Sequence, residues 1–144
     1  MRQSAVRSDH AEIAAHVLDA IDREAAAAGL RECCGALVGT VRGGITRVVA
    51  FEPLENAAVA ADRSYEVRAD DVLRVQRHWE DQGFDVVGFY HSHPTAEAVP
   101  SATDAMHAVP GYLYVIAGER VRGWRTEAAG EPFTEIRLRP VTRG

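Results

Sequence analysis

Cysteine is scarce in this sequence, since the 144 residues contain only two, at the adjacent positions 33 and 34. Neighbouring residues of a strand point to opposite faces, so Cys33 and Cys34 cannot build an ordinary disulfide framework. Two thiols are also too few for a structural zinc site of the four-cysteine kind. We therefore interpret both residues as small apolar side chains of a protein in a reducing compartment.

Long apolar runs and basic clusters are missing too. No segment approaches the roughly 20 apolar residues of a membrane span, and the N-terminus lacks a charged and then apolar secretion signal. The net charge is −5 and no basic run is present, so nucleic-acid binding has no electrostatic support. We expect a cytoplasmic protein that binds neither membrane nor nucleic acid.

Internal repeats, low-complexity tracts and linkers are absent, so the chain is expected to form one domain over residues 1–144. A chain of this length can bury a sizeable core and does not need disulfides or metal ions for stability. Its 47% hydrophobic and 26% charged residues are ordinary for a globular protein.

The apolar pattern near the N-terminus predicts a helix. Ile13, Val17 and Ile21 repeat every four residues, as on one face of a helix. Ser8 is a plausible N-cap for this helix, and Gly29 is a plausible C-terminal stop.

The rest of the chain alternates between strand and helix patterns. A tight hairpin turn at Gly43-Gly44 is expected to join two strands. The expected strands cover residues 33–41, 45–51, 86–91, 112–116, 120–126 and 133–138, and the further helices cover residues 69–82 and a segment that begins near residue 101. This order predicts an α+β fold, in which a mixed β-sheet is flanked by helices.

Two histidines, a serine and an aspartate lie within fourteen positions, in the order His91-Ser92-His93-Pro94 and then Ser101 and Asp104. The apolar, β-prone run before them predicts a buried strand. Residues two apart on a strand share a face, so His91 and His93 can aim at one metal ion while Ser92 points away.

The donor set fits a hydrolytic zinc site. Zinc accepts imidazole nitrogen and carboxylate oxygen, and a catalytic zinc keeps three protein ligands with water in the fourth position. His91, His93 and Asp104 supply three such donors without a thiolate. Each residue alone has a simpler interpretation, because a single histidine is usually a core or rim residue and Ser-x-x-Asp is also a helix capping box. At this joint spacing we favour the metal site.

At these positions the chain resembles the JAMM (MPN+) metallopeptidases, and most closely their bacterial stand-alone type. The shared pattern is His-x-His-Pro, a serine that follows the second histidine after a gap of seven residues, and then x-x-Asp, with an upstream catalytic glutamate that is usually followed by Cys-Gly. The corresponding upstream segment here is Glu32-Cys33-Cys34-Gly35. The resemblance spans about residues 10 to 140 and implies the JAMM/MPN fold, which is cytidine-deaminase-like.

The resemblance also implies roles for these residues. Zn²⁺ is expected at His91, His93 and Asp104, with Glu32 as general base and then general acid. Ser101 is expected to be the second catalytic residue, because its hydroxyl can donate a hydrogen bond to the developing oxyanion.

JAMM enzymes typically cleave the amide after the C-terminal glycine of a ubiquitin-like protein. The resemblance therefore implies a β-grasp partner that ends in glycine, either a ubiquitin-like modifier or a sulfur carrier. Deconjugation, precursor processing and release of cysteine from a sulfur carrier all stay open at this point. The irregular segment from Asn56 to Arg63 is the candidate substrate-binding loop, although it fits an ordinary surface connection equally well.

Other function classes fit less well. A metal-free MPN scaffold usually lacks one or more ligands, and this chain lacks none. A zinc nucleoside deaminase would require Pro-Cys-x-x-Cys, which is absent. A serine hydrolase would require a Gly-x-Ser-x-Gly turn, and Pro100-Ser101-Ala102 is not one. The oligomeric state is not predicted.

Overall fold

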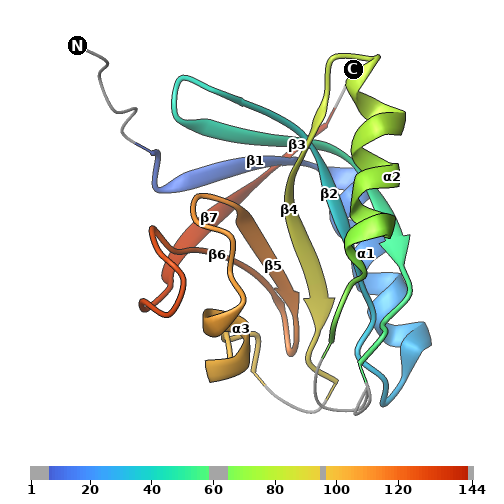
Figure 1. Ribbon diagram of the computed structural model, residues 1–144. Coiled ribbons are helices and arrows are strands. Elements are labelled where there is room, and N and C mark those ends of the chain that lie inside the picture. The colour runs from blue at the N-terminus through green and yellow to red at the C-terminus, as the bar shows by residue number, and fades with distance from the viewer. Residues whose placement is uncertain (1–6, 59–64, 95–96, 143–144) are drawn as a thin grey trace.

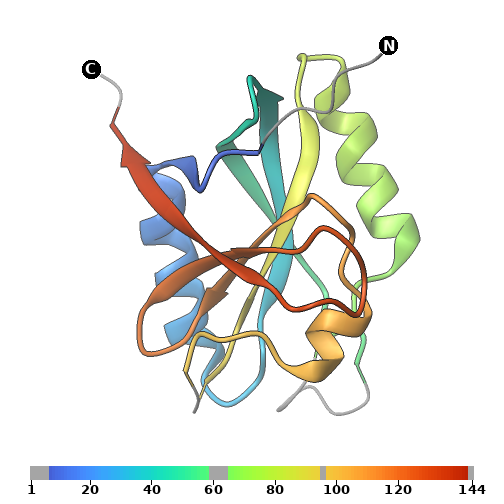
Figure 2. The same ribbon diagram turned by 90° about the vertical axis from the view of Figure 1, so that its left-hand side faces the viewer.

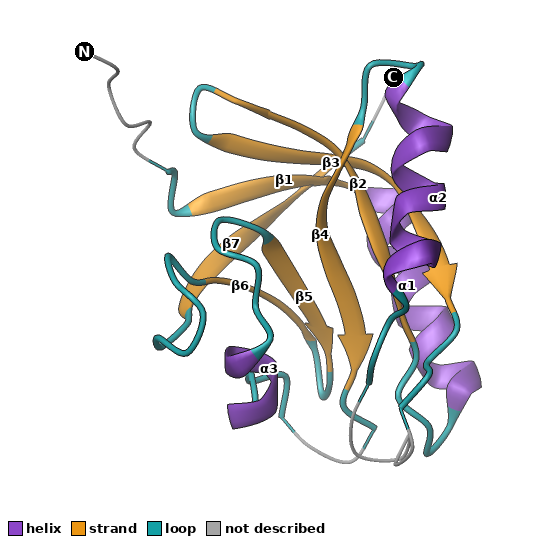
Figure 3. Ribbon diagram, in the orientation of Figure 1, coloured by secondary structure: helices purple, strands orange, loops and turns teal. Residues whose placement is uncertain are grey.

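A computed structural model describes residues 7–58, 65–94 and 97–142 (Figure 1). Three helices and seven strands are formed by these residues (Figure 3). The strands are β1 (His10–Ala14), β2 (Cys34–Arg42), β3 (Ile45–Leu54), β4 (Asp85–Ser92), β5 (Leu113–Ala117), β6 (Val121–Arg125) and β7 (Thr134–Val141). The helices are α1 (Ala15–Ala28), α2 (Ala69–Glu80) and α3 (Ala102–Met106). None of these helices is long and apolar enough to cross a membrane.

The strands form one mixed sheet in the order β1-β3-β2-β4-β5-β6-β7. β1 pairs in parallel with both β3 and β7, which closes the sheet into a barrel. β4 and β5 are also parallel, whereas the hairpin neighbours are antiparallel. The predicted combination of a mixed sheet with helices is confirmed.

The sheet separates two apolar cores. α1 contributes Val17 and Ile21 to the first core, and α2 contributes Val75 to the second. Side chains alternate along β2, so that Leu37 faces the first core and Ala36 faces the second. The two long helices accordingly lie on opposite sides of the β2 to β4 part of the sheet (Figure 2).

The predicted hairpin between β2 and β3 is confirmed. Gly43 and Gly44 have φ values of 60° and 77°, a region that side chains with a Cβ rarely adopt. Two consecutive positive φ values are typical of the tight turn that matches the twist of paired strands. β3 continues to Leu54, three residues beyond the end that we predicted for this strand.

The predicted N-terminal helix is too long, and Ser8 is not its cap. Residues 10–14 form strand β1, and α1 begins only at Ala15 without any side-chain cap. The Ser8 hydroxyl lies 2.7 Å from Nδ1 of His10 instead. The physical reason is tertiary, because Ala11 and Ile13 are fully buried on a strand held between β3 and β7.

Candidate metal centre

The C-terminal end of β4 carries the two histidines. His91 lies on the strand and is 1% exposed, and His93 follows it with its backbone N–H bonded to the carbonyl of Ala117 on β5. Ser92 faces the other way, since its Oγ accepts a hydrogen bond of 2.9 Å from the backbone N–H of Cys33. The two histidine Nε2 atoms are 3.1 Å apart. The strand alternation expected for this motif is therefore observed.

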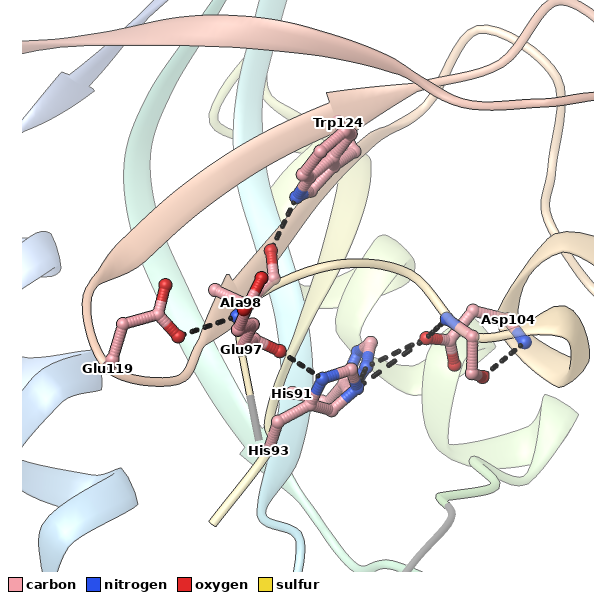
Figure 4. Close-up of polar contacts among 8 residues, drawn as sticks. His91, His93, Glu97, Ala98, Asp104, Glu119 and Trp124 are labelled. Atoms are coloured by element: carbon pink, nitrogen blue, oxygen red, sulfur yellow. Dashed lines mark hydrogen bonds and ion pairs between the residues drawn. The ribbon is translucent and has the colours of Figure 1, made fainter. Parts of the chain in front are cut away.

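α3 brings Asp104 to the same place. Its Oδ2 lies 3.3 Å from Nε2 of His91 and 3.6 Å from Nε2 of His93 (Figure 4). The same Oδ2 accepts a hydrogen bond of 2.8 Å from the backbone N–H of Ser101, and the N–H of Asp104 donates to Ser101 Oγ at 3.1 Å. This reciprocal pair is a capping box. Ser-x-x-Asp therefore caps the helix and also supplies a candidate metal ligand. The cap fixes the carboxylate that faces the histidines.

The spacing of the three donor atoms fits a single zinc ion. Ligand atoms placed 2.0–2.1 Å from zinc at tetrahedral angles lie about 3.3 Å from one another. The three distances among His91 Nε2, His93 Nε2 and Asp104 Oδ2 are 3.1, 3.3 and 3.6 Å. Two imidazoles and one carboxylate also form a donor set that leaves a fourth position for water.

Glu32 lies beside the two histidines. It lies two residues before the start of β2 and is only 6% exposed. One oxygen of its carboxylate and one ring nitrogen of each histidine all lie within 4.8 Å of one another. The backbone carbonyl of Glu32 accepts a hydrogen bond of 2.8 Å from the side chain of Asn56. A carboxylate at this distance can reach a water molecule held at the centre.

Burial and hydrogen bonds set the protonation states of the donors. Burial lowers the pKa of His91, and the nearby Asp104 carboxylate offsets this only in part, so the imidazole is neutral. Burial raises the pKa of Asp104, but hydrogen bonds from His91 and His93 outweigh it and hold the pKa well below its usual range. Both groups are thus in the form that binds a metal ion.

The tautomer of His93 follows from its backbone partner. Its Nδ1 lies 2.9 Å from the carbonyl oxygen of Glu97, and because a carbonyl only accepts, Nδ1 carries the proton. Burial lowers the pKa of His93, but the hydrogen bonds with Asp104 and with the Glu97 carbonyl outweigh it, so the net change is upward. Nε2 faces Asp104: in the protonated ring it donates to the carboxylate, and in the neutral ring, with the proton on Nδ1, it is unprotonated and can bind a metal.

An aromatic side chain that the sequence motif does not include packs on this centre. The ring of Tyr65 stacks on the ring of His91, with centroids 4.2 Å apart and planes at 21°. Burial raises the pKa of Tyr65 well above its usual value, so its hydroxyl stays protonated. No spacing rule identifies this residue, because it lies far from His91 in sequence.

A groove opens beside Asp104, with a cavity volume of about 1030 Å³. Its walls combine aromatic side chains of β4 and β5 with apolar side chains of α2, including Phe89, Tyr114 and Val72. Of the candidate loop from Asn56 to Arg63, only residues 56–58 belong to the described ranges, and the remainder lies outside them. Ala58 lines the groove.

Comparison with known proteins shows the family of the chain. Residues 14–127 match the family model of prokaryotic homologs of the JAB domain. The match covers most of the chain, and the protein therefore belongs to this family.

Several relatives are similar over much of the chain. A Haloferax volcanii protein named desampylase is 38% identical over 106 residues, which cover 73% of this chain and 75% of the relative. A CysO-cysteine peptidase of Mycobacterium tuberculosis is 36% identical over 90 residues, which cover 62% of this chain and 60% of that protein. The solution structure of a Desulfitobacterium hafniense protein superposes with a TM-score of 0.77 at 20% identity over 92% of both chains, which supports the fold alone.

Proposed function

We propose that this protein is a zinc-dependent peptidase that hydrolyses the amide bond after the C-terminal glycine of a ubiquitin-like or sulfur-carrier protein. The convergence of three donor atoms at 3.1–3.6 Å, next to a buried glutamate, is the observation that carries this proposal. The names of two relatives, a desampylase and a CysO-cysteine peptidase, point to the same chemistry. The two cysteines are free, which suits the reducing cytoplasm that we expect.

His91, His93 and Asp104 would hold the zinc ion. When bound, zinc lowers the pKa of a coordinated water toward about 7 and polarises the substrate carbonyl. Glu32 accepts the proton of the attacking water and passes it to the leaving amine. Its burial supports this role, because the carboxylate is held close to both histidines rather than in solvent.

Ser101 is the proposed donor to the developing oxyanion. Its Oγ accepts from the N–H of Asp104, so the hydroxyl proton can point away from the helix. The residue is exposed, and the hydroxyl is therefore accessible to a substrate carbonyl. Such a donor acts most strongly when it meets the negative charge of the transition state.

The groove beside Asp104 is the proposed binding site for the residues that precede the scissile bond. It is lined mainly by apolar side chains from α2, β4 and β5. An extended glycine tail has no bulky side chains and can run along such a groove to the centre. The loop from Asn56 to Arg63 stays the candidate specificity segment.

The names of the two relatives suggest two alternative substrates. Cleavage of a ubiquitin-like modifier from its target is our first version, since the relative named desampylase matches over the longer segment. Release of cysteine from a sulfur carrier is the second, since the relative named CysO-cysteine peptidase is 36% identical. Incubation with a small β-grasp protein that carries either a C-terminal peptide fusion or a C-terminal cysteine separates the two by mass spectrometry.

Substitution of Glu32 by glutamine tests the catalytic roles. Glu32→Gln should bind zinc like wild type but lose most turnover, because the amide cannot take up the proton. Asp104→Ala should lose both zinc and turnover. Glu80→Gln is the matched control, since Glu80 is exposed at the end of α2. Normal turnover by Glu32→Gln would refute the acid and base assignment, and wild-type protein without zinc affinity would favour the non-catalytic scaffold.

A further inference from the structure

One peptide unit next to the metal centre is hydrogen-bonded at both ends. Its carbonyl, that of Glu97, accepts from Nδ1 of His93 at 2.9 Å. Its N–H, that of Ala98, donates to Oε2 of Glu119 at 3.0 Å. In a trans peptide these two groups point in opposite directions, so Glu119 and His93 lie at opposite ends of the same unit (Figure 4).

The segment that carries this peptide unit is anchored on its other side as well. The carbonyl of Ala98 accepts a hydrogen bond of 2.9 Å from Nε1 of Trp124, and this bond is buried. Ala98 is 0% exposed. Trp124 lies on β6, and Glu119 lies in the turn between β5 and β6. The β5–β6 hairpin therefore binds both the N–H and the carbonyl of Ala98. The Glu97 carbonyl therefore has little freedom to turn away from His93.

The chemical consequence follows from the charge of Glu119. Metal-binding histidines commonly donate their second N–H to a carboxylate or a carbonyl, which fixes the tautomer and raises the basicity of the ligand nitrogen. Here a carboxylate acts on the histidine through a peptide group. Because hydrogen bonds in a chain polarise one another, an anionic acceptor at the Ala98 N–H strengthens the bond that the Glu97 carbonyl accepts.

We infer that Glu119 is a positioning residue, which strengthens the bond from His93 to the metal through the Glu97–Ala98 peptide unit. The inference rests on the proposed function in one respect, namely that zinc is the ion bound by His93. Glu119 lies outside the His-x-His-Pro and Ser-x-x-Asp motif. Its contribution is electronic and geometric, and it does not contact the substrate.

Two substitutions of Glu119 separate charge from anchoring. Glu119→Gln keeps an acceptor oxygen and removes the charge, whereas Glu119→Ala removes the acceptor. Loss of such an outer partner typically weakens metal binding by about tenfold or more, which we expect for alanine. A neutral acceptor forms a hydrogen bond roughly half as strong, so glutamine should weaken zinc binding by about threefold. Glu131→Gln, at an exposed turn, is the control for charge alone.

Two measurements read the result. Competition with a chromogenic chelator gives the zinc affinity, and NMR of the metal-free protein gives the frequency of the His93 Nδ1–H proton. We expect this proton to move to lower frequency in the order wild type, glutamine variant, alanine variant, because the hydrogen bond weakens in that order. If Glu119 only held the loop in place, the zinc affinity could change, but the Nδ1–H frequency would not shift in the glutamine variant, which keeps the acceptor oxygen.

The outcomes are distinct from those of the proposed function. Graded changes in both readouts, with Glu131→Gln at the wild-type values, support the inference. Zinc affinities indistinguishable from wild type, or a Nδ1–H resonance that does not move in either variant, overturn it. If the alanine variant does not fold, the glutamine variant still decides. A protein that cleaves no glycine-terminated substrate would refute the proposed function, but it would leave both readouts meaningful.

Discussion

Replacement of Ser101 by alanine separates two roles of one hydroxyl. In the structure Ser101 Oγ accepts the N–H of Asp104 at 3.1 Å, and this caps α3. The backbone N–H of Ser101 still donates to Asp104 Oδ2 at 2.8 Å after the substitution, so the carboxylate keeps its orientation. The variant therefore loses a cap and the proposed oxyanion donor, but not the bond that positions Asp104.

The two losses differ in magnitude. An N-cap serine replaced by alanine lowers the free energy of unfolding by about 1 kcal/mol. Removal of an oxyanion donor raises the activation barrier by about 2.7–4 kcal/mol, which corresponds to a decrease in kcat of about 10² to 10³. The loss of turnover should therefore greatly exceed the effect of the lost cap, and zinc affinity should change little.

The assay measures kcat on a glycine-terminated fusion, together with the urea midpoint and the zinc affinity. Ser101→Thr is the matched control, because threonine keeps both the hydroxyl and the capping acceptor, and it should retain much of the activity. A decrease in kcat of less than about tenfold in Ser101→Ala would contradict the oxyanion role. A parallel loss of zinc would show that the hydroxyl acts through Asp104 instead.

Three further predictions concern the surroundings of the site. Tyr90→Phe removes a hydrogen bond of 2.6 Å to Glu24 and should lower the free energy of unfolding by about 1.5 kcal/mol in urea titrations; an unchanged midpoint would show that this bond contributes nothing. Burial raises the pKa of Cys33 to about 11 and of Cys34 to about 12, so both thiols should resist alkylation at pH 8 until the protein unfolds; rapid labelling of native protein would contradict this. The depressed pKa of Asp104 stabilises the metal-free fold above the unfolded pKa of about 3.9, and that stability is lost as pH falls further. Metal-free Asp104→Asn should therefore show a weaker acid dependence of its urea midpoint than wild type, and an equal dependence would refute the linkage.

The parts of the site that lie close in sequence could be predicted from the sequence. His91 and His93 follow an apolar run and share one side by strand alternation, and Ser101 and Asp104 are joined by a single turn of chain. Glu32 was identified by its resemblance to a family motif. Pairing between β2 and β4 explains why it lies near His91. Cys34, two residues later, lies opposite His91 between β2 and β4.

The parts that depend on tertiary structure could not be predicted. β1 has only five residues and runs directly into α1, so the spacing of Ile13, Val17 and Ile21 resembled one continuous helix. Only its parallel pairing with β3 and β7, which are distant in sequence, makes it a strand.

The same limit applies around the metal centre. The Glu97 group that fixes the tautomer of His93 is a backbone carbonyl, and any residue type supplies one. Glu119 and Tyr65 act through a neighbouring hairpin and through ring stacking, neither of which leaves a spacing pattern in the sequence.

X-ray absorption at the zinc edge, on protein loaded with one equivalent of zinc, tests the central claim most directly. We predict nitrogen and oxygen neighbours at about 2.0–2.1 Å with the outer-shell scattering of two imidazoles, from His91 and His93, and no sulfur shell. A sulfur shell at about 2.3 Å, contributed by Cys33 or Cys34, or a zinc ion without imidazole neighbours, would contradict the account.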